Sequence, residues 1–170
     1  QETIINAVKN SANFSGLSEK EIKDLIEPCS IEHFTCGENV FNQNMSGDSM
    51  FIVINGEFTT NENHKGVRKE MRTLCKPDAF GLKTFLLSEP RRITVRCKSI
   101  DGWTLEIKRG DFNNIQELHP RILDDLSAIL IQREQENHKK HHSIDEQESQ
   151  NEEISKIILN KIANLFHKKK

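Results

Sequence analysis

The distribution of apolar residues divides the chain into helical ends and a β-rich middle. Apolar residues recur at helical spacing in Thr3–Asn10 and again after Ser18, which with Glu21 forms the pattern of a capping box. From about residue 29 to residue 109 the pattern changes to short apolar runs separated by turn residues, which is typical of strands. The helical period then returns. The sequence therefore predicts helices on either side of a small β-barrel or sandwich.

The strongest strand signal lies in Met50–Ile54, a continuous apolar run. It ends at Asn55-Gly56, a dipeptide that favours a hairpin turn, so Glu57–Thr60 is expected to return beside it. Asn61–Gly66 is polar and predicts a hairpin tip. Asp101-Gly102 predicts a turn between two further strands.

The C-terminal part predicts two helices followed by a polar stretch and a last helix. Apolar positions predict a short helix at Phe112–Leu118 and a longer one from Ile122, with Pro120 allowing the second to start. Residues 138–152 are polar and are interpreted as a linker. Residues 153–170 predict a basic amphipathic helix. Its apolar stripe suits docking on the barrel or self-association, which are favoured over a membrane surface because the stripe is short.

Size and charge limit the class of protein. A chain of 170 residues is one domain by the usual length prior, and its net charge of −2 gives no field that favours nucleic acid. No apolar run approaches the ~18 residues needed to cross a bilayer. Because the chain begins with Gln1, it is interpreted as part of a longer protein, and a membrane domain upstream is compatible with the sequence.

Candidate reactive groups are few. The cysteines form no Cys-x-x-Cys pair and are interpreted as reduced core thiols, with a disulfide framework or zinc site as the alternative: Cys29, Cys36, Cys75 and Cys97. His138 and His142 are one helical turn apart, as in metal sites, but they lie in a polar stretch with His141, and solvated histidines are favoured. No nucleophile motif or Gly-Lys-Ser/Thr phosphate loop is present, so we predict no catalytic residue and no metal.

The most informative segment is Phe80–Val95. Gly81 opens a short apolar turn, Pro90-Arg91 closes it, and a β-branched strand follows. Free backbone N–H groups at the start of such a turn, facing an arginine, can hold a phosphate. The segment resembles the phosphate-binding cassette of cyclic-nucleotide-binding domains, usually Phe-Gly-Glu-Leu-Ala-Leu and, six residues on, Arg-Ala-Ala-Thr-Val. The positions in register are Phe80, Gly81, Pro90, Arg91, Thr94 and Val95.

Two upstream segments extend the resemblance. Phe34–Val40 is similar to the family's aromatic-x-x-Gly-Glu-x-Val/Ile, and Gly47–Gly56 is similar to its Gly-Asp-Ser-Met-Tyr run. The resemblance implies an α+β fold, mainly β: a jelly-roll-like β-barrel with an internal phosphate-binding cassette, N-terminal helices and two C-terminal helices. It also implies a nucleotide-binding domain at 1–137, with the barrel at about 29–109 and lid helices at about 110–137. The linker 138–152 and the helix 153–170 follow.

The resemblance places the ligand-binding residues in the cassette: Phe80, Gly81, Leu82, Lys83, Thr84, Pro90, Arg91, Arg92 and Ile93. It implies that Arg91 pairs with the exocyclic phosphate oxygens and that backbone N–H groups of the turn add donors. Leu82 replaces the family's Glu, which accepts a hydrogen bond from the ribose 2′-hydroxyl. Losing that bond costs about 1.5–3 kcal/mol, so weak or absent binding is expected. Arg92 stands where a Ser or Thr favours guanine, so cyclic AMP is expected over cyclic GMP.

The segment after the β-rich region indicates a more specific function. Glu117–Asn137 resembles the end of bacterial channels, related to the small-conductance mechanosensitive family, that carry a C-terminal cyclic-nucleotide domain. This implies a non-catalytic regulatory domain that gates an attached channel or other effector. The implied setting is a cytoplasmic domain of an inner-membrane protein, homo-oligomeric at full length, with no nucleic-acid partner. The alternative is a degenerate fold that binds no cyclic nucleotide and serves as an interaction or assembly module.

Overall fold

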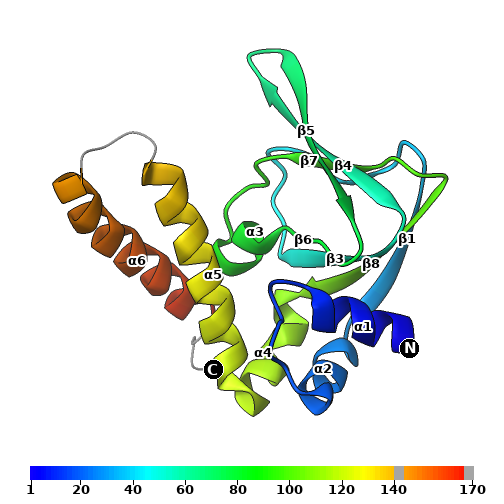
Figure 1. The fold of residues 1–170 in the computed structure, drawn as a ribbon, viewed down its shortest axis with the longest axis horizontal. Coiled ribbons are helices and arrows are strands. Elements are labelled where there is room, and N and C mark those ends of the chain that lie inside the picture. Colours follow the sequence, from blue (N-terminus) through cyan, green and yellow to red (C-terminus); the bar gives the residue numbers. More distant parts are fainter. Residues whose placement is uncertain (140–143, 167–170) are drawn as a thin grey trace.

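Helices from both ends of the chain gather on one side of a β-barrel (Figure 1). The computed structural model describes residues 1–139 and 144–166, apart from the side chains of residues 144–147. The helices are α1 (Glu2–Asn10), α2 (Glu19–Ile26), α3 (Leu82–Leu87), α4 (Arg109–Leu118), α5 (Pro120–His138) and α6 (Ile144–Phe166). The strands are β1 (Ser30–Thr35), β2 (Asn39–Phe41), β3 (Ser49–Asn55), β4 (Glu57–His64), β5 (Val67–Cys75), β6 (Ala79–Phe80), β7 (Thr94–Cys97) and β8 (Asp101–Lys108).

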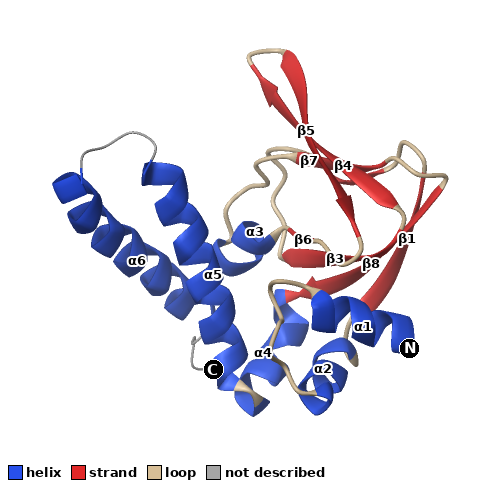
Figure 2. Ribbon diagram, in the orientation of Figure 1, coloured by secondary structure: helices blue, strands red, loops and turns tan. Residues whose placement is uncertain are grey.

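The strands form two antiparallel sheets that face each other. Their orders are β1-β8-β3-β6 and β2-β7-β4-β5. All of these strands lie within the range 29–109 predicted for the barrel. Figure 2 shows the strands on one side and the helices on the other, with α3 inserted between β6 and β7. This confirms the predicted α+β fold, in which helices flank a jelly-roll-like barrel.

Strand β3 separates two apolar cores. Met50 and Ile52 pack with the helices in the larger core, whereas Phe51 and Val53 point into the barrel, where Phe58 is also buried. A strand covered on both faces needs a continuous apolar run rather than an alternating one. This double burial explains why β3 gave the strongest strand signal in the sequence.

An ion pair joins the N-terminal helices to α5. Ser18 and Glu21 form the predicted capping box at the start of α2. The Glu21 carboxylate also accepts hydrogen bonds from Arg121 Nε at 3.0 Å and Nη2 at 2.8 Å. The hydrogen bond from Arg121, together with those from Ser18, lowers the pKa of Glu21 to about 2. One carboxylate therefore caps α2 and holds the start of α5.

We expect Glu21→Gln to lower the urea midpoint of unfolding at pH 7, because glutamine keeps the capping geometry but loses the charge that Arg121 binds. The folded pKa of about 2 lies below the ordinary value of about 4.3. The charged Glu21 therefore stabilises the fold above about pH 4.3, and this stabilisation is lost as pH falls toward 2. The difference between variant and wild type should shrink at pH 3. A difference that stays constant with pH would contradict the assignment.

The predicted hairpin at Asn55-Gly56 is wrong, because the flanking strands enter different sheets. β3 ends at Asn55 and pairs with β8 and β6, whereas β4 starts at Glu57 and pairs with β5 and β7. Gly56 has a φ of +85°, and a Cβ there would lie 2.5 Å from the Asp101 carbonyl oxygen. The glycine therefore lets the chain cross between sheets at a crowded corner.

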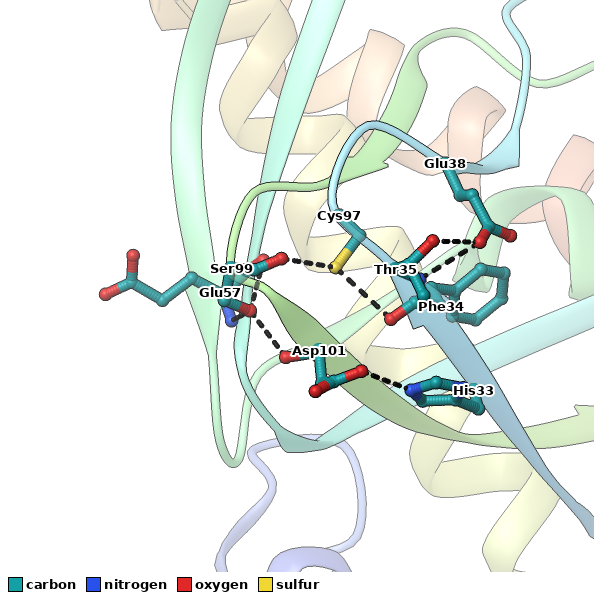
Figure 3. A network of polar contacts seen from close by, with 8 residues as sticks. All are labelled: His33, Phe34, Thr35, Glu38, Glu57, Cys97, Ser99 and Asp101. Atoms are coloured by element: carbon teal, nitrogen blue, oxygen red, sulfur yellow. Dashed lines mark hydrogen bonds and ion pairs between the residues drawn. The ribbon is translucent and has the colours of Figure 1, made fainter.

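The predicted turn at Asp101-Gly102 is also wrong, because these residues begin β8. A Cβ on Gly102 would lie 2.5 Å from the Phe58 ring, so this glycine makes room for a core side chain. The bend comes at residues 99–100. There Ser99 Oγ accepts a hydrogen bond from the Glu57 amide at 2.9 Å and donates one to the Asp101 carbonyl at 2.7 Å (Figure 3).

Several other predictions need correction. β4 continues to His64, so the hairpin tip is shorter than the predicted Asn61–Gly66. Cys36 and Cys75 are exposed rather than in the core, whereas Cys97 is buried. Helix α6 begins at Ile144, so the described residues between 144 and 152 are helical instead of a linker. Glutamate, glutamine and isoleucine tolerate helix well enough for packing against α5 to extend it.

No helix in the described ranges is long and apolar enough to span a membrane. Those ranges also contain no cluster of three or more side chains that could hold a metal ion. The histidine pair considered above is only partly covered, because His141 and His142 lie outside the described residues.

Candidate functional site

The segment after β6 makes a sharp turn into α3. Gly81 precedes the helix with a φ of +85°. A Cβ there would lie 2.7 Å from Arg91 Nη1 and 3.1 Å from the Ser49 carbonyl oxygen, so only glycine fits without displacement. The first turn of a helix leaves its N–H groups without intrahelical acceptors. In α3 these groups belong to the residues directly after Gly81, and they are donors available to an anion.

Arg91 lies beside this turn and points inward. Its side chain is 4% exposed, and its guanidinium carbon lies 4.2 Å from the centre of the Phe41 ring. Nη1 donates to the Gly81 carbonyl oxygen at 3.4 Å. Among the described residues, no group accepts a hydrogen bond from Arg91 Nε. A buried guanidinium with donors left over is suited to bind an anion.

The charge on Arg91 persists at neutral pH. Burial lowers the pKa of the guanidinium to about 10, against the opposing charges of Asp48 and Glu106. Gly47 makes room for the group, since a Cβ there would lie 2.7 Å from Arg91 Nη2. The arginine is therefore held as a cation between two glycine backbones and an aromatic ring.

A pocket of about 270 Å³ opens between the cassette and α5. Every residue that the sequence predicted for the ligand site lines it: Phe80, Gly81, Leu82, Lys83, Thr84, Pro90, Arg91, Arg92 and Ile93. The sequence missed the remaining walls, which are Phe41 of β2 and the α5 residues Leu130, Arg133, Glu134 and Asn137. Helical spacing from Leu130 would have pointed to positions 134 and 137, since they share its face.

Larger hollows occur beside α1 and α2, one of about 880 Å³ between the two helices and one of about 420 Å³ near Cys29. We consider the smaller pocket the better candidate. It combines apolar and aromatic walls with a buried cation and convergent backbone donors, as ligand sites usually do.

Two cassette residues, Leu82 and Lys83, make contacts outside the pocket. Leu82 is 3% exposed and belongs to the larger apolar core, so its side chain helps to anchor α3. Lys83 is held by carboxylates: its Nζ lies 3.0 Å from Glu134 of α5 and 3.6 Å from Glu89. The pocket therefore contains the cation Lys83 and the carboxylate Glu134 at its junction with α5.

Arg109 braces the opposite end of α3. Its Nε donates to the Phe85 carbonyl oxygen at 2.8 Å, and its Nη2 donates to the Thr84 carbonyl oxygen at 2.9 Å. A cation near the C-terminal carbonyls of a helix interacts favourably with them, and here it adds donors beside the Ser88 amide, which donates to Thr84 at 2.9 Å. This contact ties the cassette to the start of α4 and hence to α5.

The comparisons with known proteins identify the family of this fold. The family model for the cyclic nucleotide-binding domain matches residues 31–119. A cGMP-dependent protein kinase from Plasmodium berghei (strain Anka) is 31% identical over 143 residues, covering 71% of this chain and 16% of the kinase. The chain thus spans less than a fifth of that relative.

Solved structures show the same fold. The Thermus thermophilus catabolite activator protein aligns with a TM-score of 0.70 at 21% identity, covering 75% of this chain and 60% of that one. The regulatory domain of Toxoplasma gondii PKA, crystallised with cAMP, aligns with a TM-score of 0.64 at 22% identity, covering 76% and 49%. With the family model matching more than half of its residues, the chain belongs to the cyclic nucleotide-binding domain family.

Proposed function

We propose that this domain binds a purine 3′,5′-cyclic nucleotide in the pocket between the cassette and α5. In this proposal the cyclic phosphate lies against the N–H groups at the start of α3 and is clasped by Arg91. The observation that carries the proposal is the buried Arg91 guanidinium beside those amides, whose Nε has no acceptor within the part of the chain that the structure describes. A guanidinium suits a phosphate because it can donate two parallel hydrogen bonds.

Cyclic AMP is the proposed ligand over cyclic GMP. Arg92 lines the pocket where a hydroxyl side chain would favour guanine, and arginine supplies no acceptor. One relative named above is a cGMP-dependent kinase, whereas the regulatory domain of Toxoplasma gondii PKA was crystallised with cAMP, so both nucleotides must be tested.

The proposed role is non-catalytic regulation of an attached effector. The opposing lid would be α5, whose Glu134 pairs with Lys83 of the cassette. Ligand that prefers one lid position shifts the population of that position, and an effector joined to the lid would respond. The resemblance of Glu117–Asn137 to the end of such channels favours a mechanosensitive-type channel as effector. A search of the complete protein sequence for membrane-spanning segments tests that part directly.

Leu82 supports a second candidate function. The cassette position directly after Gly81 is a leucine whose side chain packs in the core. It therefore offers no carboxylate to accept a hydrogen bond from a ribose hydroxyl. A domain that has lost ligand binding but kept its fold would serve as an interaction or assembly module.

Isothermal titration calorimetry separates these functions. We expect saturable heat with cyclic AMP and weaker binding of cyclic GMP, both about 10- to 100-fold weaker than a site with the additional carboxylate would give. 5′-AMP, which carries the same base on an open phosphate, serves as the control ligand. Absence of saturable binding by either cyclic nucleotide at millimolar concentration would reject the sensor in favour of the assembly module.

A further inference from the structure

Helix α6 packs against the cassette helix through an apolar stripe. Ile158, Ile162 and Phe166 recur every four residues and are 5%, 3% and 8% exposed. The Phe166 ring lies 5.7 Å from the Phe85 ring of α3 and 6.0 Å from the Phe112 ring of α4. The end of the described chain is thus built into the same core that anchors the cassette.

A chain of ion pairs runs from α5 through the cassette to α6. Glu134 Oε2 lies 3.0 Å from Lys83 Nζ, Lys83 Nζ lies 3.6 Å from Glu89 Oε2, and Glu89 Oε1 lies 2.9 Å from Lys161 Nζ. Partial burial opposes ionisation of Glu89. The hydrogen bond from Lys161 and the charges of Lys83, Lys161 and Arg92 nevertheless hold the pKa of Glu89 below its usual value. Glu89 therefore stays a charged partner of Lys83 and Lys161 near neutral pH.

The candidate ligand pocket and a cavity beside α6 are lined in part by the same residues. Lys83, Arg92 and Glu134 line the candidate ligand pocket and also a second cavity of about 210 Å³, whose far side is α6. Lys161 and Ile158 lie on that far side. If a ligand displaced Lys83 or Glu134, the cavity that these residues line beside α6 would change shape.

α6 also contacts the lid helix. Gln135 Nε2 of α5 donates to the Asn151 carbonyl oxygen at 3.1 Å and to Ser155 Oγ at 3.0 Å. Figure 1 shows α6 lying alongside α5. At the end of α6, the Phe166 ring lies 5.7 Å from the Phe85 ring of α3. Because α6 touches both the cassette helix and the lid helix, it can dock fully only when these two are close together.

We propose that α6 is a clamp whose docking is coupled to occupancy of the pocket, each strengthening the other. The inference rests on the proposed function and adds its route of regulation. A closed lid provides both supports of α6, so ligand that closes the lid stabilises docking. By the reciprocity of linked equilibria, undocking α6 must weaken ligand binding by the same factor. Whatever follows Phe166 in the protein would then receive the signal.

The test uses the whole chain and two readouts, hydrogen exchange of α6 amides and calorimetry with cyclic AMP. Ile162→Ser removes a buried contact, and Leu159→Ser is the matched control because Leu159 is 49% exposed on the same helix. We expect Ile162→Ser to accelerate α6 exchange and to weaken binding about five- to tenfold, with the control near wild type. Saturating ligand should slow α6 exchange in the wild type. Accelerated exchange without loss of affinity would overturn the clamp.

Failure of the clamp and failure of the proposed function are distinguishable. If the wild type binds neither cyclic nucleotide, the proposed function fails, and the coupling is measured in the free chain. There Lys83→Met breaks the ion pairs that join the lid to the cassette, and the exposed Lys156→Met is its control. Faster α6 exchange in Lys83→Met alone supports the coupling. Exchange equal to that of the control contradicts it.

Discussion

Replacing Arg91 with methionine should weaken cyclic AMP binding about 100-fold or more, because two charge-assisted hydrogen bonds to phosphate contribute about 3 kcal/mol or more together. Arg91→Lys should lose less, about tenfold, since an ammonium keeps the charge but cannot donate in the fork geometry. Calorimetry of the purified domain measures both variants against wild type.

The fold should tolerate Arg91→Met. The arginine is 4% exposed, lies against Phe41, and has a donor without an acceptor in the described chain. A buried charge that is not paired with a carboxylate carries a desolvation cost, which an apolar side chain of similar length avoids. We therefore expect the melting temperature to stay the same or rise while binding weakens about 100-fold or more. Arg68→Met, on the exposed strand β5, is the control for loss of a positive charge. Wild-type affinity in Arg91→Met would refute the anion site.

The residues predicted for the candidate site lie together because the cassette is local. Gly81, Pro90 and Arg91 lie within a dozen residues, and one glycine with positive φ fixes how they face each other. Local turn chemistry of this kind is visible in the order of residues. The nine predicted residues consequently line one pocket.

Features that depend on distant partners could not be predicted. Asn55-Gly56 has the composition of a hairpin turn, yet the sheet that each strand joins is decided by pairing with β7 and β8, more than 30 residues away. The ion pair between Glu134 and Lys83 could not be predicted, because the two residues are 51 positions apart in the sequence. Tertiary context outweighs local preference in both cases.

The last helix illustrates the limit of composition. Residues 144–152 have few apolar positions, so they suggested a linker. The helix forms because its second half buries Ile158, Ile162 and Phe166. Helix formation is cooperative, so a docked segment extends into neighbouring polar residues that propagate helix adequately.

Replacing Phe85 with alanine should destabilise the domain by about 3–5 kcal/mol, the largest loss of stability expected here for one substitution. Phe85 is fully buried at the junction of α3, α4 and α6, with ring centres 5.3 Å from Phe112 and 5.7 Å from Phe166. The cavity left by the ring would remove aromatic contacts to two helices at once. Urea unfolding followed by circular dichroism measures the loss.

Two further variants show whether this loss reflects the junction itself. Phe85→Leu keeps most of the apolar volume and should recover more than half of the stability, since volume-conserving exchanges are tolerated best. Ile100→Ala removes an apolar side chain that is 85% exposed and should change stability by about 0.5 kcal/mol or less. Because α3 also carries the amides of the anion site, Phe85→Ala should weaken ligand binding in the fraction that remains folded. A loss below about 1 kcal/mol would mean that the helices do not depend on this ring for their packing.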